Sequence, residues 1–306
     1  MLAFHRDLLD DAERTLAFRD AIRAVVKPGD VVVDLGSGSG ILAFFAVEAG
    51  AARVYAIEKQ HMADVAALVA RHNGYADRVT FLHEHSLEAS LPERANVLIT
   101  ETLGMLGLDE QILGATIDAR SRFLLPGAAI IPARVALSAV PVELPYDHQR
   151  LVGWWSEPRH GLDLAPLRLF ASNSQYGAHI NEDAWLTAPE TLVDLDLTTI
   201  DSVDVTGRTS FTIARDGLCH GFGGWFDASL VADGSIRVTN RIPHKTHWMQ
   251  AFLPLEHPVE VVRGDVVELE LQSRDGRAWR WRGAVNSRAF DQLTTLAMPP
   301  CPAAKK

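Results

Sequence analysis

The feature that most constrains the fold is a glycine-rich segment that follows a short apolar strand pattern. Residues 31–33 are an unbroken run of valines, of the kind that a parallel sheet buries on both faces. The run leads into Asp34-Leu35-Gly36-Ser37-Gly38-Ser39-Gly40, and the apolar, helix-forming stretch 41–49 follows. A strand, a glycine-rich turn and a helix in this order predict the opening of a nucleotide-binding βαβ unit.

Strand and helix patterns alternate on both sides of this unit. Apolar residues recur at steps of three and four over 2–26, which predicts one helix before the first strand. The patterns that follow are strands at 54–57, 79–82 and 95–100 and a helix at 64–72. Alternation of this kind predicts a doubly wound parallel sheet, in an α/β Rossmann-like domain over residues 1–132.

After Pro132 the pattern changes to strands with two-residue alternation, separated by Gly, Asp and Asn. The clearest are 210–214, 235–239, 266–271 and 278–281. Strands without comparable helices between them predict an antiparallel sandwich or barrel, so a second domain is expected over 133–306. The segment 151–191 is irregular and rich in Trp, Pro, His and Asn, and it is too long for a simple connection.

The composition argues against several classes of protein. With 29 Lys plus Arg against 39 Asp plus Glu the net charge is −10, which argues against a nucleic-acid partner. No apolar run reaches the ~18 residues that cross a bilayer, and residues 1–20 lack a signal-peptide core, so a cytoplasmic protein without a membrane partner is expected.

Cys219 and Cys301 form no CxxC pair. His83 and His85 share one face of a predicted strand, but no third ligand is evident in the sequence, so no metal is predicted.

The residues around the turn indicate an adenosine-containing ligand. Glycines let the backbone approach a ligand closely, and the following helix offers unpaired N–H groups. Glu58 lies 24 residues after Asp34, at the end of the next strand pattern, where a carboxylate can accept hydrogen bonds from ribose hydroxyls. The dinucleotide fingerprint GxGxxG would need glycine where Ile41 stands, which disfavours a nicotinamide oxidoreductase.

The segment 34–40 together with Glu58 resembles the S-adenosylmethionine site of class I methyltransferases. Three further segments make the chain similar to the protein arginine methyltransferase family. They are a helix over 5–22 with Arg14-Thr15 in its middle, Glu101 and Glu110 nine residues apart around Gly104, and Thr246-His247-Trp248. In that family the two glutamates form a hairpin, and the Thr-His-Trp loop lies in the β-barrel half.

This resemblance implies a fold, a cofactor and an assembly. The fold is a Rossmann-like methyltransferase domain followed by an antiparallel β-barrel with a helical dimerisation arm over about 155–190, and the assembly is a homodimer. The cofactor is S-adenosyl-L-methionine, which leaves as S-adenosyl-L-homocysteine. The residues that the resemblance assigns to the cofactor are Arg14, Asp34, Gly36, Gly38, Gly40, Glu58, Ser86, Leu87 and Glu88. Those assigned to catalysis are Glu101, Glu110 and His247, and those assigned to the substrate are the two glutamates and Trp248.

Arginine as the acceptor explains why two glutamates are needed. A guanidinium is protonated at neutral pH, with a pKa above ~12, and its nitrogens have no free lone pair to attack a methyl group. Two carboxylates can hold it by charge-assisted hydrogen bonds and draw positive charge away from the reacting nitrogen. Glu101 and Glu110 are the predicted pair, and Trp248 is expected to form an apolar wall. His247 is a candidate to steady the site or to help the proton leave.

Each of these residues also has a purely structural interpretation. Glu110 could begin a helix over 111–121, where an acidic residue favours the helix dipole. His247 and Trp248 could be a core pair of a barrel strand, and Arg14 could be a solvated charge on a helix. Glu101 ends a strand of an α/β sheet, which is where functional residues collect.

The acceptor and the product stay open at this stage. Residues 1–4 alone precede His5, so the aromatic lid helix of the family is expected to be missing or supplied by something else. The acceptor could be an arginine-containing protein or peptide, free L-arginine or another small molecule. A cofactor-binding partner protein without catalysis is the alternative from a different class. Leu8 and Ile112 stand where many members have methionines that bear on which dimethyl product forms.

Overall fold

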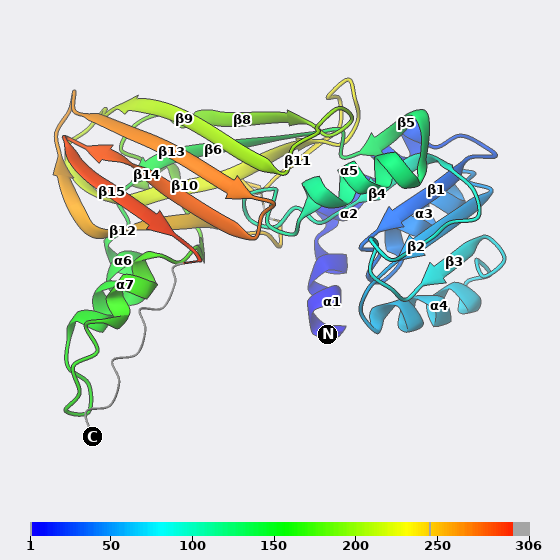
Figure 1. The fold of residues 1–306 in the computed structure, drawn as a ribbon, viewed down its shortest axis with the longest axis horizontal. Coiled ribbons are helices and arrows are strands. Elements are labelled where there is room, and N and C mark those ends of the chain that lie inside the picture. Colours follow the sequence, from blue (N-terminus) through cyan, green and yellow to red (C-terminus); the bar gives the residue numbers. More distant parts are fainter. Residues whose placement is uncertain (1, 245, 296–306) are drawn as a thin grey trace.

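The glycine-rich segment follows a strand that lies at the centre of a parallel sheet. In the computed structural model, which describes residues 2–244 and 246–295, β1 (Val31–Leu35) is buried along its whole length. The sheet has the order β3-β2-β1-β4-β5 (Figure 1), with β3 (Val79–Leu82), β2 (Arg53–Ile57), β4 (Ala95–Thr100) and β5 (Leu124–Ile131). The strand order reverses beside β1, and ligands of such sheets bind at this switch point, outside the carboxyl ends of the strands.

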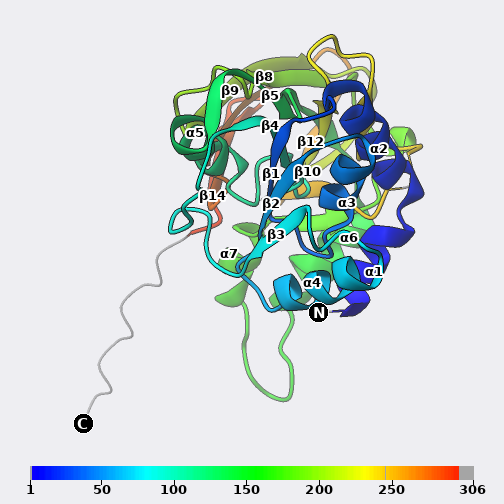
Figure 2. The ribbon, with the colours of Figure 1, turned by 90° about the vertical axis from the view of Figure 1, so that its right-hand side faces the viewer.

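Helices cover both faces of this sheet. They are α2 (Ala12–Val25), α3 (Ile41–Glu48), α4 (Met62–His72) and α5 (Ile112–Arg122). Figure 2 shows α2 and α3 on one side of the sheet and α5 on the other. The predicted α/β arrangement is therefore confirmed, and the ends of the predicted helices and strands move by few residues.

The helix predicted over 2–26 is wrong in one respect, because it is two helices. α1 (Leu2–Asp10) ends before Asp11, whose backbone leaves the helical region at ψ 83°. The Asp11 carboxylate then accepts a 2.9 Å hydrogen bond from the Arg14 amide, which satisfies an unpaired N–H of the first turn of α2. The buried face of α2 includes Phe18 and Ile22, whereas Leu16 of the predicted apolar face is 43% exposed.

The strand β5 contains Pro126 and Gly127, a pair that favours a turn. The pairing register between β4 and β5 shifts between Ala95 and Val97, so the strand is bulged. Proline is tolerated here because β5 is an edge strand and has one neighbour to satisfy. The chain leaves this strand directly into the second domain.

The second domain consists of two antiparallel sheets that face each other (Figure 1), as the alternating pattern predicts. The six-stranded sheet contains β7 (Tyr176–Ala178), β12 (Gln250–Val261), β10 (Gly217–Ser229), β6 (Arg134–Val142) and β8 (Glu190–Asp196), with β11 (Arg237–Thr239) paired to β10. The four-stranded sheet contains β15 (Arg288–Leu293), β14 (Ala278–Val285), β13 (Val266–Arg274) and β9 (Asp204–Thr212). Large side chains such as Phe222, Phe226 and Trp281 are fully buried in it.

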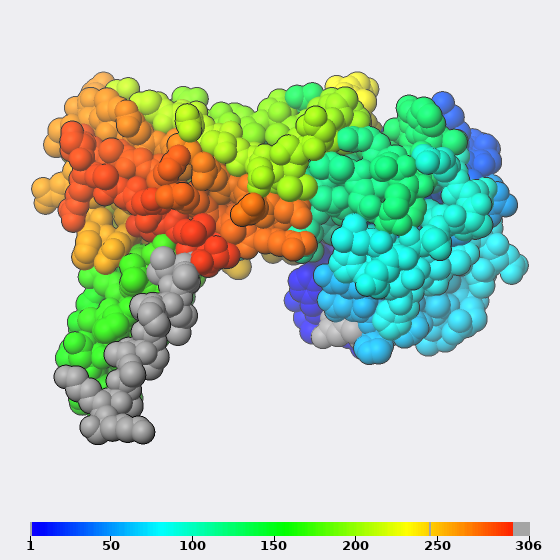
Figure 3. Space-filling model, viewed as in Figure 1, coloured from blue at the N-terminus to red at the C-terminus, as the bar shows by residue number. Residues whose placement is uncertain are grey.

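A helical arm projects from the second domain between β6 and β7 (Figure 1). It contains α6 (Pro145–Leu151), a 3-10 turn (Gly153–Ser156) and α7 (Leu167–Ser172). The observed arm differs from the expected range 155–190 at both ends. It begins at Pro145, and it ends before β7, which already belongs to the six-stranded sheet through its pairing with β12. The space-filling view shows a hollow between the arm and the first domain (Figure 3).

Two further sequence expectations meet the structure here. Within the described residues, no helix is long and apolar enough to cross a membrane. Cys219 is buried, and burial raises the pKa of its thiol to about 12, so it is an unreactive core residue. Cys301 lies outside the described residues.

Candidate active site

The glycine-rich turn is closed in by side chains on two sides. Gly36, Gly38 and Gly40 all have positive φ, of 70°, 50° and 81°, which L side chains rarely adopt. A Cβ on Gly38 would lie 2.9 Å from Cε1 of His5, and one on Gly36 would lie 3.0 Å from a methyl carbon of Thr102. Glycine is therefore required both by the backbone and by the space, and α1 lies against the turn that the cofactor is expected to use.

Glu58 lies beside this turn, as its position at the end of β2 predicts. One carboxylate oxygen accepts a 3.1 Å hydrogen bond from the Gly38 amide, and the other accepts a 2.8 Å bond from the Gln60 amide. These two bonds fix the orientation of the carboxylate at the edge of the sheet. Each oxygen keeps a further lone pair for a ligand hydroxyl.

Asp34 lies under the turn with 1% of its surface exposed. Neither carboxyl oxygen has a hydrogen-bond partner among the described residues. Burial, together with the nearby charge of Glu58, raises the pKa of Asp34 to about 7, although the nearby backbone N–H of Ala43 acts to lower it. A buried polar group without a partner is costly, and it fits a site that is completed by a polar ligand.

Ser86, Leu87 and Glu88 form a turn after the carboxyl end of β3, at the same edge of the sheet as the glycines. The Arg122 guanidinium holds this turn from α5, because it donates 2.6 Å hydrogen bonds to the carbonyls of Ser86 and Ala89. Leu87 is 56% exposed and Glu88 is also exposed. Sequence reasoning missed Arg122, which has the helical i,i+4 spacing to its ion-pair partner Asp118 but no motif.

Arg14 and Glu101 form an ion pair in the protein interior. Nε of Arg14 donates a 2.8 Å hydrogen bond to Oε2 of Glu101, and Nη2 donates a second bond to the same oxygen. The two side chains are 5% and 8% exposed. Arg14 is therefore not the solvated charge that a helix arginine usually is, and Glu101 already binds a guanidinium.

Glu110 ends the loop that begins at Glu101, just before α5. Its side chain is exposed, and its carboxylate has neither a hydrogen bond nor an ion pair within 2–244 and 246–295. Desolvation by the surrounding protein, and then the charges of Glu101 and Asp109, raise the pKa of Glu110 to about 7. The two glutamates are thus close enough to interact, and Glu110 is free to receive a cation.

Asp109 is a functional candidate that sequence reasoning missed. One oxygen accepts a 2.8 Å hydrogen bond from the Leu106 amide, and the other accepts a 2.7 Å bond from the indole N–H of Trp279. Gln175 adds a longer contact of 3.4 Å. Burial raises the pKa of Asp109. The Asp109 carboxyl group thus holds the loop closed and joins it to β14. The sequence signal that could have identified Asp109 is an acidic residue in the otherwise apolar run before Glu110.

The turn between β13 and β14 packs against the loop that carries Asp109 and Glu110. A Cβ on Gly276 would lie only 1.8 Å from the Leu108 carbonyl oxygen, so the two backbones touch. Asp275 accepts a 3.1 Å hydrogen bond from the Gly114 amide, in the first turn of α5, where the N-cap residue Gln111 makes no side-chain cap. The second domain therefore caps a helix of the first and supports the segment that carries Glu110.

His247 reaches the site through Asp11, at the break between α1 and α2. One carboxylate oxygen of Asp11 accepts hydrogen bonds from the His247 amide at 2.7 Å and from the ring Nδ1 at 2.9 Å. Although burial acts to raise it, these bonds and the one from the Arg14 amide lower the pKa of Asp11. Trp248 is 8% exposed, and its ring centroid lies 6.0 Å from the Arg14 guanidinium carbon.

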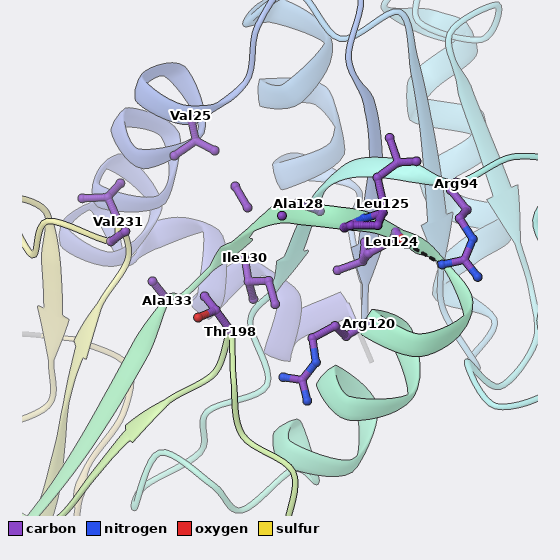
Figure 4. A pocket seen from close by; sticks show the side chains of 14 residues that line it. Val25, Arg94, Arg120, Leu124, Leu125, Ala128, Ile130, Ala133, Thr198 and Val231 are labelled. Carbon is purple, nitrogen blue, oxygen red and sulfur yellow. Dashed lines mark hydrogen bonds between the residues drawn. The ribbon is translucent and has the colours of Figure 1, made fainter.

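A separate cavity of about 630 Å³ lies along β5, where the two domains meet (Figure 4). Val25, Ile130, Val231 and Arg120 are among the side chains that line it. Its lining contains none of the residues predicted for cofactor or substrate. Glu58 and Glu101, which were predicted for cofactor and catalysis, lie instead at the opposite edge, where β2 and β4 end.

Both domains of the chain resemble known methyltransferases in sequence. Residues 133–286 match the family model described as the arginine methyltransferase oligomerization subdomain, and residues 15–110 match that of ribosomal protein L11 methyltransferase. The chain is 31% identical over 284 residues to protein arginine N-methyltransferase 6 of Danio rerio, covering 88% of this chain and 81% of the relative. It is 29% identical over 313 residues to the probable protein arginine N-methyltransferase 6 of Arabidopsis thaliana, covering 87% and 72%.

Solved structures share the whole fold. The Trypanosoma brucei PRMT1 enzyme-prozyme heterotetrameric complex with AdoHcy superposes with a TM-score of 0.85, at 22% identity, over 96% of this chain and 98% of that one. Protein arginine methyltransferase 10 of Arabidopsis thaliana gives 0.79 at 24% identity, over 96% and 97%. Sequence and fold together lead to one conclusion: this chain belongs to the protein arginine N-methyltransferase family.

Proposed function

We propose that the chain transfers the methyl group of S-adenosylmethionine to a guanidino nitrogen of arginine in a protein or peptide. The observation that carries this proposal is the state of the two glutamates. Glu101 holds the guanidinium of Arg14 in a buried ion pair, while Glu110 is exposed and has no partner among the described residues. A site that holds one guanidinium and keeps a second carboxylate open is chemically suited to a substrate arginine.

The residues at the glycine-rich turn fit the cofactor. S-adenosylmethionine supplies a methyl group on a positively charged sulfur. The turn and the start of α3 offer close backbone approach, and Glu58 is fixed with lone pairs to spare for ribose hydroxyls. Nη1 of Arg14 makes only two long contacts of 3.4 Å, so this nitrogen is available for the carboxylate of the cofactor.

The two glutamates have complementary tasks in the transfer. Their charges hold the substrate guanidinium and offset its repulsion from the cationic sulfur. Both bonds from Arg14 go to Oε2 of Glu101, so Oε1 of Glu101 and the carboxylate of Glu110 are left for two nitrogens of the substrate. These bonds draw positive charge toward the carboxylates and leave the third nitrogen richer in electrons. Glu110 performs this task as a carboxylate, which with a pKa of about 7 requires neutral or alkaline pH.

His247 acts through Asp11, which favours the steadying role over the proton-transfer role. The Asp11 carboxylate bonds the second domain through His247 and the first turn of α2 through the Arg14 amide. Arg14 in turn holds Glu101 in the buried ion pair. We assign His247 as a positioning residue for this chain of contacts.

The test of the function is mass spectrometry after incubation with S-adenosylmethionine and either an Arg-Gly-rich peptide or free L-arginine. We expect methylation of the peptide, because the net charge of −10 favours the approach of a basic segment. Methylation of free L-arginine alone would overturn the choice of a peptide acceptor. Cofactor binding by calorimetry without methylation of either would overturn the transfer and favour a noncatalytic partner protein.

We also propose that the chain works as a homodimer through its arm. The arm and its connections expose apolar side chains, among them Tyr146 at 75% and Leu162 at 63%. The first domain exposes Leu68 on α4, at 59%, as a surface of matching character. Light scattering should give twice the monomer mass, and Leu162→Asp should lower it, whereas Val262→Asp, an exposed apolar residue of the barrel, should not. A monomeric wild type would contradict this.

The cytoplasmic location and the lack of a nucleic-acid partner stay predictions.

A further inference from the structure

A cluster of ligand-type side chains lies outside the methyl-transfer site, where α4 begins and β3 ends. His61 and Asp64 are three residues apart at the start of α4, so they share one face of its first turn. His83 comes directly after β3 and joins them from the neighbouring element. The sequence pattern places His83 and His85 on one face of a strand and predicts no metal, but β3 ends at Leu82, before both histidines. Nδ1 of His85 accepts a hydrogen bond from the Leu87 amide instead.

The spacing of the three side chains is that of metal ligands. One atom from each residue can be chosen so that all three lie within 4.8 Å of one another. The Nδ1 atoms of His61 and His83 lie 3.7 Å and 3.3 Å from the same Asp64 oxygen. Two ligands of a tetrahedral zinc ion with bonds of 2.0–2.1 Å are about 3.3 Å apart. Small rotations of exposed side chains would thus bring all three onto one ion.

We propose that His61, Asp64 and His83 form a binding site for a divalent transition-metal ion of the zinc class. Two imidazoles and one carboxylate suit Zn²⁺ and its neighbours better than Mg²⁺ or Ca²⁺, which take mostly oxygen ligands. The side chains are exposed by 86%, 69% and 35%, so water can complete the coordination.

The bound ion would tie two parts of the first domain together. It joins the first turn of α4 to the end of the edge strand β3, and both flank the carboxyl edge of the sheet. His61 follows Gln60, whose amide bonds Glu58. The ion therefore stabilises the folded state by mass action, as any ligand does that binds the native protein alone. This site does not depend on methyl transfer, and its test needs no cofactor.

The test is calorimetric titration of ZnCl₂ into the chelator-treated, tag-free full chain. We expect one saturable site in the wild type. His83→Ala and Asp64→Asn should weaken Zn²⁺ binding by about tenfold or more. Losing only the hydrogen-bond partner of a metal ligand already lowers metal affinity by about tenfold, and these changes remove a ligand itself. The matched control is His85→Ala, which removes an exposed histidine two residues away and should bind Zn²⁺ as the wild type does. A lack of saturable binding, or equal binding in His83→Ala, would overturn the proposal.

Two further measurements guard against misfolding and against zinc bound elsewhere. Zn²⁺ should raise the Tm of the wild type and of His85→Ala, but not that of His83→Ala. Co²⁺ should give visible absorption bands of nitrogen and oxygen coordination in the wild type, and these should be lost in His83→Ala. Intense thiolate bands, or bands that persist in His83→Ala, would place the ion at another site.

Discussion

The indole N–H of Trp279 donates a 2.7 Å hydrogen bond to Oδ1 of Asp109, and it thereby joins the second domain to the loop that carries Glu110. Asp109 uses its other oxygen to close that loop through the Leu106 amide. The position of one glutamate of the pair thus depends on a barrel strand 170 residues further along the chain.

Trp279→Phe tests this dependence. The change keeps the aromatic ring but removes one donor from a largely buried carboxyl group, which costs about 1–3 kcal/mol. We expect kcat to fall by about tenfold or more, because small displacements of catalytic groups are costly. The matched control is Trp281→Phe in the same strand, which loses a similar bond to the Pro254 carbonyl but should keep kcat. Equal loss of activity in both variants, at equal stability, would refute a specific role of Asp109.

The pH dependence of activity should follow Glu110. Its pKa is raised to about 7, so kcat/KM at saturating cofactor should rise with pH and level off above about 7 as the carboxylate forms. Stability should change in the opposite direction. Between the unfolded pKa of 4.5 and the folded pKa, the folded state holds a proton that the unfolded state lacks, so this contribution to stability falls as pH rises. Activity that stays constant through pH 7 would contradict the assignment.

Asp109→Asn should shift the acidic limb of this pH profile, the range in which kcat/KM rises with pH. The charge of Asp109 is one of the causes that raise the pKa of Glu110, so its removal should move the limb of the pH profile to lower pH. Trp281→Phe leaves Asp109 and its hydrogen bond from Trp279 in place, so its pH profile should match that of the wild type. Identical pH profiles for Asp109→Asn and the wild type would show that Asp109 acts by structure alone.

Asp11→Asn separates helix capping from the contact with His247. Asparagine is about as good an N-cap as aspartate, so the Tm should change little. The charge that holds the His247 ring is lost, and we expect kcat to fall while cofactor affinity changes less. Asp233→Asn is a suitable control, since it changes a surface carboxylate that also caps a backbone amide. Unchanged kinetics in Asp11→Asn would remove His247 from the catalytic arrangement.

Glu101→Gln should strongly lower the rate of methyl transfer while the protein still binds cofactor. The loss should be about 10²–10³-fold or more, as for other groups that stabilise charge in a transition state. Glu93→Gln serves as the control because Glu93 also pairs with an arginine, Arg53, but on the surface. Methylation of an Arg-Gly-rich peptide is the readout, with calorimetry of the cofactor beside it. A wild-type rate in Glu101→Gln would disprove the role of the glutamate pair.

Local pattern was sufficient to predict the strand, the glycine-rich turn and the helix that begin the first domain. The buried valine run predicts β1, and glycines at positive φ are needed wherever the backbone must turn between a strand and a helix. Glu58 and Glu101 end neighbouring strands of a parallel sheet, so they had to lie at the same edge. These determinants act between residues that are close in sequence or that share a repeating geometry.

The sequence by itself thus determined the two kinds of domain and the edge of the parallel sheet at which Glu58 and Glu101 lie. Tertiary structure alone decided that Asp11 breaks the first helix to hold His247, 236 residues away, and that Asp109 bonds Trp279. It also decided that His83 meets His61 and Asp64 rather than His85. The physical reason is that a hydrogen bond or a ligand cluster needs atoms within about 3 Å, and no spacing along the chain shows which distant segments folding will bring to that distance.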